Sequence, residues 1–306
     1  AIYESAGAIQ PVGAGIIIAN NAMQIFKKAG ISDSIEKAGQ RVSLMKITDE
    51  RMTVLSLMDL LKYENRYGVC NIAIHRAALQ KILAEQAGFE NIHLSKRLVN
   101  IENKESYVFT FEDGSTGSSD IVIGADGIKS TVRSRLFNTG DIRDTRQLCW
   151  RGIGDWDCGD TYQNEAIEMW GKGKRFGFVK ISATKIYWYA VINQWLVKGN
   201  NNDLTDLFRE FHGDVSKIIA ATAPQDIFRS NIIDLKPVFT WARGKACLIG
   251  DAAHATTPNL GQGACQAIED AYALAELLAS GKSMEDAFVL YEKLRMKKAH
   301  DIVKRS

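Results

Sequence analysis

Residues 247–278, CLIGDAAHATTPNLGQGACQAIEDAYALAELL, decide the fold of this chain. The stretch opens as an apolar strand that ends in Gly250 and Asp251, and a glycine-rich loop then leads into a long amphipathic helix. An acid at the carboxyl end of a buried strand can accept hydrogen bonds from polyol hydroxyls. Gly261 and Gly263 lack side chains, so the backbone there can lie close against a flat ring. The stretch therefore predicts a binding site for a ligand that carries both a polyol and a ring.

The loop and the helix after it support the same interpretation. Pro258 stiffens the loop, and the free N–H groups where the helix begins, near Ala264, favour a negatively charged ligand atom. The apolar positions expected on one helix face are Ala264, Cys265, Ala267, Ile268, Ala271, Leu274, Ala275 and Leu278. Any one of these features alone is better explained as a capped helix start. Strand, acid, proline, Gly-Gln-Gly and helix in a single run favour a ligand site.

A second block lies at residues 120–133, DIVIGADGIKSTVR. Asp126 and Gly127 follow an apolar strand, and Ser130 and Arg133 come after them. Taken alone, Asp126 and Gly127 are also compatible with an ordinary turn, and Arg133 with a solvated helix residue. The presence of the first stretch in the same chain favours a ligand-binding role for this block.

Together the two blocks resemble the GD and DG motifs of the class A flavoprotein aromatic hydroxylases, which include p-hydroxybenzoate and salicylate hydroxylases, zeaxanthin epoxidases and urate-hydroxylating members. The resemblance covers nearly the whole chain and implies FAD as the cofactor. It assigns the flavin ring and ribityl chain to Asp251 and the loop after it, and the DG block to the FAD pyrophosphate and the entry of NAD(P)H. The implied cofactor-binding residues are Glu4, Arg76, Leu98, Asp126, Asp251, Pro258, Gly261, Gln262, Gly263 and Ala264.

Three of these residues rest on weaker matches. Glu4 resembles the acid that binds the adenosine ribose, and Leu98 lies on a strand that resembles the one near the adenine. Arg76 resembles an arginine that reaches FAD, although a surface helix cation is a serious alternative.

The activity implied by the resemblance is monooxygenation. NAD(P)H reduces FAD, O2 adds to the reduced flavin, and the C4a-hydroperoxide transfers one oxygen to a small, electron-rich, aromatic substrate, which is hydroxylated or epoxidised. Because the flavin carries the chemistry, neither a catalytic triad nor a metal site is expected. A histidine can serve as a general base, but the place of His254 on the glycine-rich loop favours a role in ordering the backbone.

The order of the predicted elements indicates an α/β (α+β) fold resembling that of p-hydroxybenzoate hydroxylase, with a Rossmann-type parallel sheet and an inserted antiparallel substrate sheet. The discontinuous FAD-binding domain is expected at 1–140 and 229–306, and the substrate domain at 141–228, with a hairpin at 41–58 added to it. Other predicted elements are helices at 21–30, 75–88 and 204–212, a strand at 246–249, a strand–turn–strand unit joining 106–112 to 120–124, and a meander at 165–169, 176–181 and 186–192.

The inserted sheet is expected to line the substrate pocket, because aromatic residues concentrate there: Trp150, Trp170, Phe176, Phe178, Tyr187, Trp188 and Tyr189. Strand alternation allows only about half of them to face a ligand. Arg175 and Tyr187 are the predicted substrate-orienting residues, since they resemble substrate-contacting positions of urate-hydroxylating relatives. Arg151 is a further candidate, and simple solvation of Arg175 is the alternative.

One family feature is missing, the amino-terminal strand, GxGxxG and helix that hold the FAD diphosphate. The triplet Gly13, Ala14, Gly15 follows the acid and is not that fingerprint. The expectation is that residues have been omitted from the ends, and an FAD-deficient or non-catalytic fragment is the alternative. A flavin-dependent reductase or halogenase on the same fold also stays open, although the Trp-x-Trp signature of halogenases is absent.

Composition limits the remaining function classes. With 38 basic and 36 acidic residues, the net charge is +2, so nucleic acid is not an expected partner. No apolar run suggests a membrane span, and the five scattered cysteines suggest neither a disulfide framework nor a zinc site. The chain is therefore expected in the cytoplasm, with a small-molecule substrate, O2 and NAD(P)H as its partners.

Overall fold

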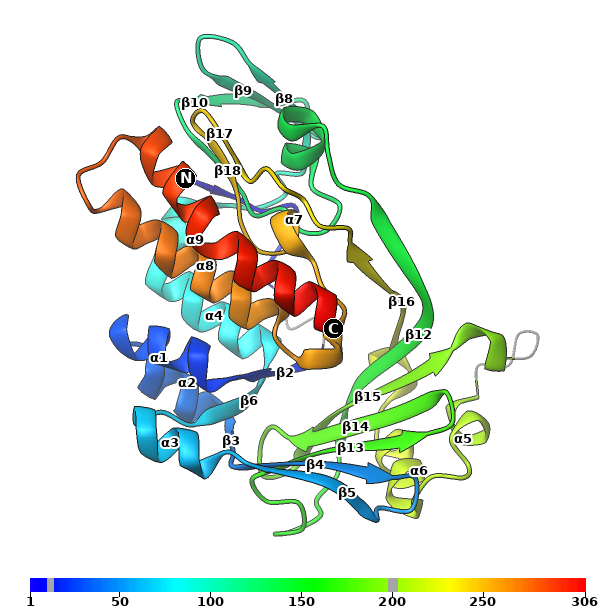
Figure 1. Ribbon diagram of the computed structural model, residues 1–306. Coiled ribbons are helices and arrows are strands. Elements are labelled where there is room, and N and C mark those ends of the chain that lie inside the picture. Colours follow the sequence, from blue (N-terminus) through cyan, green and yellow to red (C-terminus); the bar gives the residue numbers. More distant parts are fainter. Residues whose placement is uncertain (10–13, 198–202) are drawn as a thin grey trace. The chain divides into compact units, whose positions relative to one another are not determined.

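The structure, a computed structural model, describes residues 1–9, 14–197 and 203–306. Packing divides them into two compact units, and each is described by itself (Figure 1). The first unit comprises 1–9, 84–145 and 233–306, and the second comprises the described parts of 10–83 and 146–232. The boundaries expected for a cofactor domain and a substrate domain refer to function, and they stay a prediction.

The first unit contains three small sheets and a helical carboxyl-terminal part. Its strands are β1 (Ile2–Tyr3), β7 (Ile92–His93), β8 (Leu98–Asn103), β9 (Tyr107–Phe111), β10 (Thr116–Ser119), β11 (Val122–Gly124), β17 (Ala242–Arg243) and β18 (Ala246–Leu248). Its helices are α7 (Asp251–His254), α8 (Gly263–Leu278) and α9 (Met284–Arg305), and a helical turn covers Arg133–Phe137. β1 pairs in parallel with β7, and β11 with β18. The long helices α8 and α9 lie side by side (Figure 1).

The predicted hairpin of this unit has a different second strand. The turn at Gly114, whose φ is 80°, leads from β9 into β10, and Thr116 lies opposite Thr110. The prediction that residues 120–124 complete this hairpin is wrong, because β11 instead pairs in parallel with β18. The sequence of β10, TGSS, lacks the apolar alternation that marks a strand.

The second unit is built on a seven-stranded sheet with the order β16-β12-β15-β14-β13-β4-β5. Its other elements are a small sheet and five helices. The bounds are β2 (Gly15–Ile18), α1 (Asn20–Lys28), α2 (Ser32–Ala38), β3 (Gln40–Val42), β4 (Leu44–Asp49), β5 (Val54–Asp59), α3 (Leu61–Tyr67), β6 (Asn71–His75), β13 (Glu165–Gly171), β14 (Lys174–Lys180), β15 (Lys185–Asn193), α5 (Leu204–Leu207) and α6 (Gly213–Ala220). Helix α4 (Arg76–Ala87) and strands β12 (Ile142–Asp155) and β16 (Phe228–Leu235) extend across the sequence limits of the units.

One face of the large sheet packs on α5 and α6. Its core contains Trp150, Phe176, Phe178 and Trp188, and the rings of Phe176 and Trp188 stack at 5.5 Å. Tyr187 and Tyr189 lie at alternate positions of β15 and therefore project from the opposite face. The prediction that alternation divides the aromatic residues between the two faces is confirmed.

Most of the predicted elements form where the periodicity placed them. The helices at 21–30 and 75–88 correspond to α1 and α4, the hairpin at 41–58 to β4 and β5, and the meander to β13, β14 and β15. The helix predicted at 204–212 is shorter, since α5 ends at Leu207 and a separate helix, α6, follows. His212 accepts the N–H of Asp214 on its Nδ1 and so caps α6, which explains the break.

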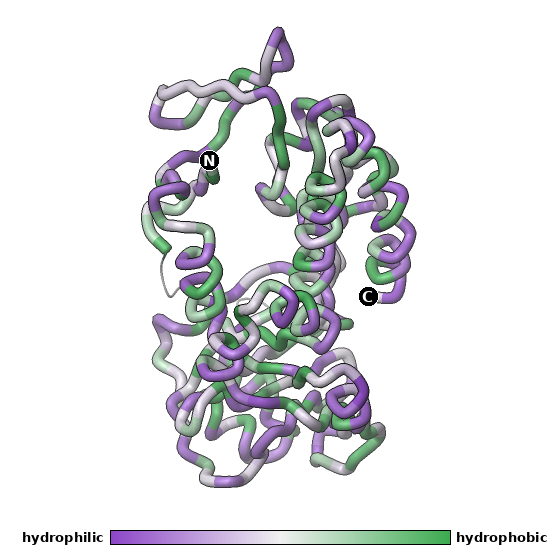
Figure 2. The backbone as a smooth tube through the Cα atoms, turned by 90° about the vertical axis from the view of Figure 1, so that its left-hand side faces the viewer, coloured by the Kyte–Doolittle hydropathy of each residue, from purple (hydrophilic) through white to green (hydrophobic). Residues whose placement is uncertain are grey.

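In the described part of the chain, none of the helices has the length and hydropathy needed to cross a membrane. Hydrophilic residues recur along α9, the helix that ends at the C-terminus (Figure 2).

Candidate functional site

The turn after β18 is shaped by Gly250. Its φ of 56° and ψ of −139° belong to a region that residues with a Cβ avoid. A Cβ at this position would also lie 3.1 Å from that of Ala267 in α8. The turn places Asp251, which is exposed, at the first position of α7. The sequence therefore needs glycine here both for the backbone angles and for the close approach of α8.

The second motif lies beside the first. The N–H of Ile249 donates to the carbonyl of Gly124 at 3.0 Å, so Asp126 and Asp251 follow the carboxyl ends of two adjacent parallel strands. The Asp126 carboxylate accepts the N–H groups of Thr131 at 2.8 Å and Val132 at 3.1 Å. It thereby caps the start of the helical turn that carries Arg133.

Arg133 joins the two motifs. Its side chain is buried, and one guanidinium nitrogen donates to the carbonyl of Ala252 in α7 at 2.8 Å. The alternative of a solvated helix residue is wrong. The contact fixes α7, and with it the turn at Asp251, against the DG block.

Glu4 and Leu98 belong to the same edge of the first unit. Glu4 follows β1, and its carbonyl accepts the N–H of Lys96 at 2.8 Å. Two residues further on, the carbonyl of Leu98 accepts the hydroxyl of Thr131 at 3.3 Å. The segment 96–98 thus bonds Glu4 at one end and, at the other, Thr131, whose N–H binds Asp126. Asp126 in turn follows β11, the parallel neighbour of the strand before Asp251.

The glycine-rich loop completes this arrangement. Pro258 begins a short turn that ends at Gly261, whose φ is 62° and whose missing Cβ would meet nothing within 4 Å. Helix α8 begins at Gly263, directly after Gln262. Among the described residues, the buried side-chain polar atoms without a hydrogen-bond partner are Thr256 Oγ1, in this loop, and Arg133 Nε, in the DG block. Both lie in the two motif segments, where a bound ligand is expected.

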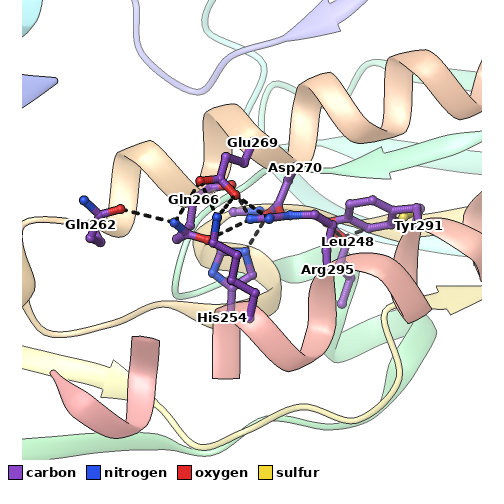
Figure 3. A network of polar contacts seen from close by, with 11 residues as sticks. Leu248, His254, Gln262, Gln266, Glu269, Asp270, Tyr291 and Arg295 are labelled. Atoms are coloured by element: carbon purple, nitrogen blue, oxygen red, sulfur yellow. Dashed lines mark hydrogen bonds and ion pairs between the residues drawn. The ribbon is translucent and has the colours of Figure 1, made fainter. Parts of the chain in front are cut away.

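A buried polar network lies behind the turn, and the sequence did not reveal it (Figure 3). The Asp270 side chain, on α8, has no exposed surface. One of its oxygens accepts the N–H of Gly250 at 3.0 Å and contacts His254 Nε2 at 2.5 Å, and the other accepts Nε of Arg295 at 2.8 Å. His254 and the backbone of Gly250 therefore share one oxygen atom of Asp270.

The buried face of α8 differs from the predicted one for this reason. Gln266 and Asp270 are buried, whereas Ala271 and Ala275 are exposed. Helical periodicity places acids on the solvent side, but Arg295 of α9 pairs with Asp270 and also donates a hydrogen bond to Gln266 Oε1 at 2.8 Å. Gln262 continues the series, since its side-chain oxygen accepts the Gln266 amide at 3.2 Å.

In the second unit, polar residues gather on the sheet face opposite α5 and α6. This polar sheet face consists of Arg151, Glu168, Arg175, Tyr187 and Tyr189. Its centre is Glu168, whose carboxylate accepts the Tyr189 hydroxyl and lies 3.9 Å from the Arg175 guanidinium. The Arg175 side chain is only 18% exposed. The alternative of a simply solvated arginine is therefore wrong.

Two glycines make room for the tyrosines of this face. A Cβ on Gly177 would lie 2.1 Å from Cζ of Tyr189, so the ring crosses that glycine to reach Glu168. A Cβ on Gly15 would lie 2.5 Å from Cγ of Tyr187. Burial raises the pKa of Tyr187 to about 12, which keeps its phenol neutral at ordinary pH. Arg76 begins α4 in the same unit and is exposed.

The geometry defines a protein with two adjacent strand-end turns suited to a dinucleotide-type ligand, and a separate polar sheet face. A family model described as an FAD binding domain matches residues 5–306. The chain therefore belongs to the FAD-binding-domain family, and it is an FAD-dependent monooxygenase of the class A hydroxylase type. The predicted family, cofactor FAD and fold class are confirmed.

Two curated relatives and one solved structure illustrate the likeness. The chain is 34% identical to the aurachin C monooxygenase/isomerase of Stigmatella aurantiaca, over 99% of this chain and 80% of the relative. It is 31% identical to the FAD-dependent urate hydroxylase of Klebsiella pneumoniae, over 99% and 81%. The structure of Klebsiella pneumoniae HpxO complexed with FAD and uric acid matches with a TM-score of 0.89 and 28% identity, covering 99% of this chain and 79% of that one.

The residues present fit FAD. Gly261 leaves the backbone open to a flat ring, and Asp251 offers an exposed carboxylate at a strand end. Thr256 holds a buried hydroxyl that has no hydrogen-bond partner within the described ranges. Among the described residues, no cluster of three or more His, Cys, Asp or Glu side chains is placed to hold a metal ion.

Proposed function

We propose that this monooxygenase uses NAD(P)H and O2 to hydroxylate or epoxidise a small aromatic substrate. The balanced reaction inserts one oxygen atom of O2 into the substrate and releases the other as water, while NAD(P)H supplies two electrons. When bound, FAD supplies the redox chemistry. The urate and quinolone compounds in the names of several relatives support a flat heteroaromatic ring that bears carbonyl groups.

The observation that carries the proposal is the polar sheet face. The guanidinium groups of Arg151 and Arg175 and the carboxylate of Glu168 are half-buried at the centre of the sheet, although charged groups are costly to desolvate. The opposite face of the same sheet is a well-packed apolar core. Folding alone does not require charges at such positions, and charged groups of this kind cluster at functional sites.

Within this face, Arg175 and Tyr187 orient the substrate. A guanidinium and a neutral phenol both donate hydrogen bonds, so they suit the carbonyl or phenolate oxygens of an electron-rich ring. Positioning of this kind is what the protein must supply, because the cofactor carries the oxygen chemistry.

The same proposal covers the cofactor contacts. Within the first unit, the proposed FAD contacts are Glu4, Leu98, Asp126, Asp251, Pro258, Gly261, Gln262, Gly263 and Ala264. The adjacency of the two strand ends and the hydrogen bonds that the segment 96–98 makes with Glu4 and Thr131 support this set. Arg76 is proposed as a further contact from the family resemblance alone.

A panel of phenols, purines, quinolones and carotenoid-like compounds tests the proposal. NAD(P)H oxidation should rise with the true substrate, and the product should gain one ¹⁸O atom from ¹⁸O2. Arg175→Met and Tyr187→Phe should raise KM, whereas Arg209→Met should not, since Arg209 is 78% exposed and pairs with Asp206 at 3.4 Å. Reduction of substrate under anaerobic conditions, with no oxygen incorporated, contradicts the proposal and favours a flavin-dependent reductase.

A further inference from the structure

We infer that Asp270 is a positioning residue for the cofactor, because its buried carboxylate holds the turn that presents Asp251. The inference rests on the proposed contact between Asp251 and FAD. Asp270 touches neither FAD nor substrate in this proposal. It acts through the backbone of Gly250.

The geometry shows how the turn is held. Asp270 Oδ2 accepts the N–H of Gly250 at 3.0 Å and also contacts His254 Nε2 at 2.5 Å. Gly250 and His254 stand at the two ends of the first turn of α7, and the N–H of His254 donates to the carbonyl of Gly250 at 2.9 Å. One oxygen atom of α8 therefore joins both ends of the segment that contains Asp251.

The second carboxylate oxygen anchors this contact to α9. Oδ1 accepts Nε of Arg295 at 2.8 Å, and Arg295 also donates to Gln266 Oε1 at 2.8 Å (Figure 3). Tyr291, one turn earlier on α9, donates to the carbonyl of Leu248, the last residue of β18, at 3.2 Å. The end of β18 therefore contacts α9 through Tyr291, and the start of α7 is connected to α9 through Asp270 and Arg295.

The carboxylate is held in its charged form. Burial acts to raise the pKa of Asp270, but the hydrogen bond and charge of His254, together with the charge of Arg295, lower it below its ordinary value. An asparagine cannot replace this group. An amide has one acceptor atom, so its NH2 would face either Arg295 or the pair of donors from Gly250 and His254.

A second carboxylate, that of Glu292, provides a control that distinguishes positioning of the cofactor from general stabilisation of the fold. Glu292, on α9, accepts the N–H groups of Trp241 at 2.5 Å and Ala242 at 3.0 Å, next to β17. It makes the same kind of contact, from a helix to backbone N–H groups, but at the residues where the β17–β18 hairpin begins, opposite Leu248, and not at the turn that follows β18. Glu292→Gln is therefore the matched control for Asp270→Asn.

The experiment compares these variants at a temperature well below their unfolding transitions. FAD affinity is measured by flavin fluorescence, and the absorption spectrum and reduction potential of bound FAD are recorded beside the thermal unfolding curve. Asp270→Asn should weaken FAD binding by about tenfold or more, as is usual for groups that support a ligand-binding group, and shift the potential. Glu292→Gln should lower thermal stability but leave affinity, spectrum and potential as in the wild type.

Further variants keep the inference testable if Asp270→Asn does not fold. His254→Leu removes one partner of Asp270 and should also weaken FAD binding, whereas His254→Gln, which can still donate to Asp270, should restore part of it. Wild-type affinity, spectrum and potential in folded Asp270→Asn or His254→Leu overturn the inference, and so do parallel losses in Asp270→Asn and Glu292→Gln. Asp251→Ala separates the two proposals, because unchanged FAD affinity in that variant refutes the proposed contact of Asp251 itself.

Discussion

Replacing Gly177 with alanine is the sharpest test of the polar sheet face. The new Cβ would lie 2.1 Å from Cζ and 2.4 Å from the hydroxyl oxygen of Tyr189, so the ring must move. Overpacking of this kind costs roughly 1–3 kcal/mol of the free energy of unfolding. For a chain of this size, the transition temperature should fall by about 2–5 °C. The displaced phenol would also lose its hydrogen bond to Glu168. The ion pair between Glu168 and Arg175 would then lack the support of the Tyr189 hydroxyl.

A double-mutant cycle assigns the effect to this contact. In a Tyr189→Ala background the space is empty, so adding Gly177→Ala should cost almost nothing, and the two changes should be strongly non-additive. Differential scanning calorimetry measures the stability, and steady-state kinetics with the identified substrate should show a higher KM for Gly177→Ala. Equal costs of Gly177→Ala in the two backgrounds would refute the contact between Gly177 and the tyrosine ring.

Three further predictions concern the turn after β18, the glycine-rich loop and the Tyr187 phenol. Gly250→Ala should cost about 1–3 kcal/mol, because its backbone angles suit glycine, and should weaken FAD binding in a fluorescence titration; wild-type affinity would contradict this. Gly261→Ala and Gly114→Ala should each cost about 1 kcal/mol of left-handed strain in open surroundings, yet only Gly261→Ala should lower FAD affinity. Burial raises the pKa of Tyr187 to about 12, so its phenol stays neutral between about pH 6 and 9. Tyr187→Phe should therefore raise KM without changing the shape of the pH–rate profile in that range. A change of rate with pH that is present in the wild type and absent in the variant would contradict this prediction.

Local sequence predicted the backbone of the turn after β18 well, because its determinants are close together along the chain. A strand, a glycine and an acid, followed by a glycine-rich loop and a helix, specify their own backbone. The structure forms β18, Gly250, Asp251 and α8 in that order. The apolar strand of the DG block was also found, although its partner was wrongly assigned.

Features that depend on pairing between distant segments were not predictable in this way. Asp270 reads as a solvent-side acid of an amphipathic helix until Arg295 is known to face it. Gly177 reads as an ordinary strand residue until Tyr189, on the neighbouring strand, is seen to cross it. A single sequence carries no signal for either contact, since both arise from the packing of elements rather than from spacing along one of them.

The contacts made by α9 have a practical consequence for anyone who wishes to build a minimal flavin-binding module. No recognised motif residue lies on this helix, yet Tyr291 and Arg295 hold the strand end and the start of α7 from behind. A design that keeps every motif residue but ends after α8 would expose Asp270 without its cationic partner. Motif content alone is therefore a poor guide to where such a module can be cut, and the last helix must be kept with the turn that it supports.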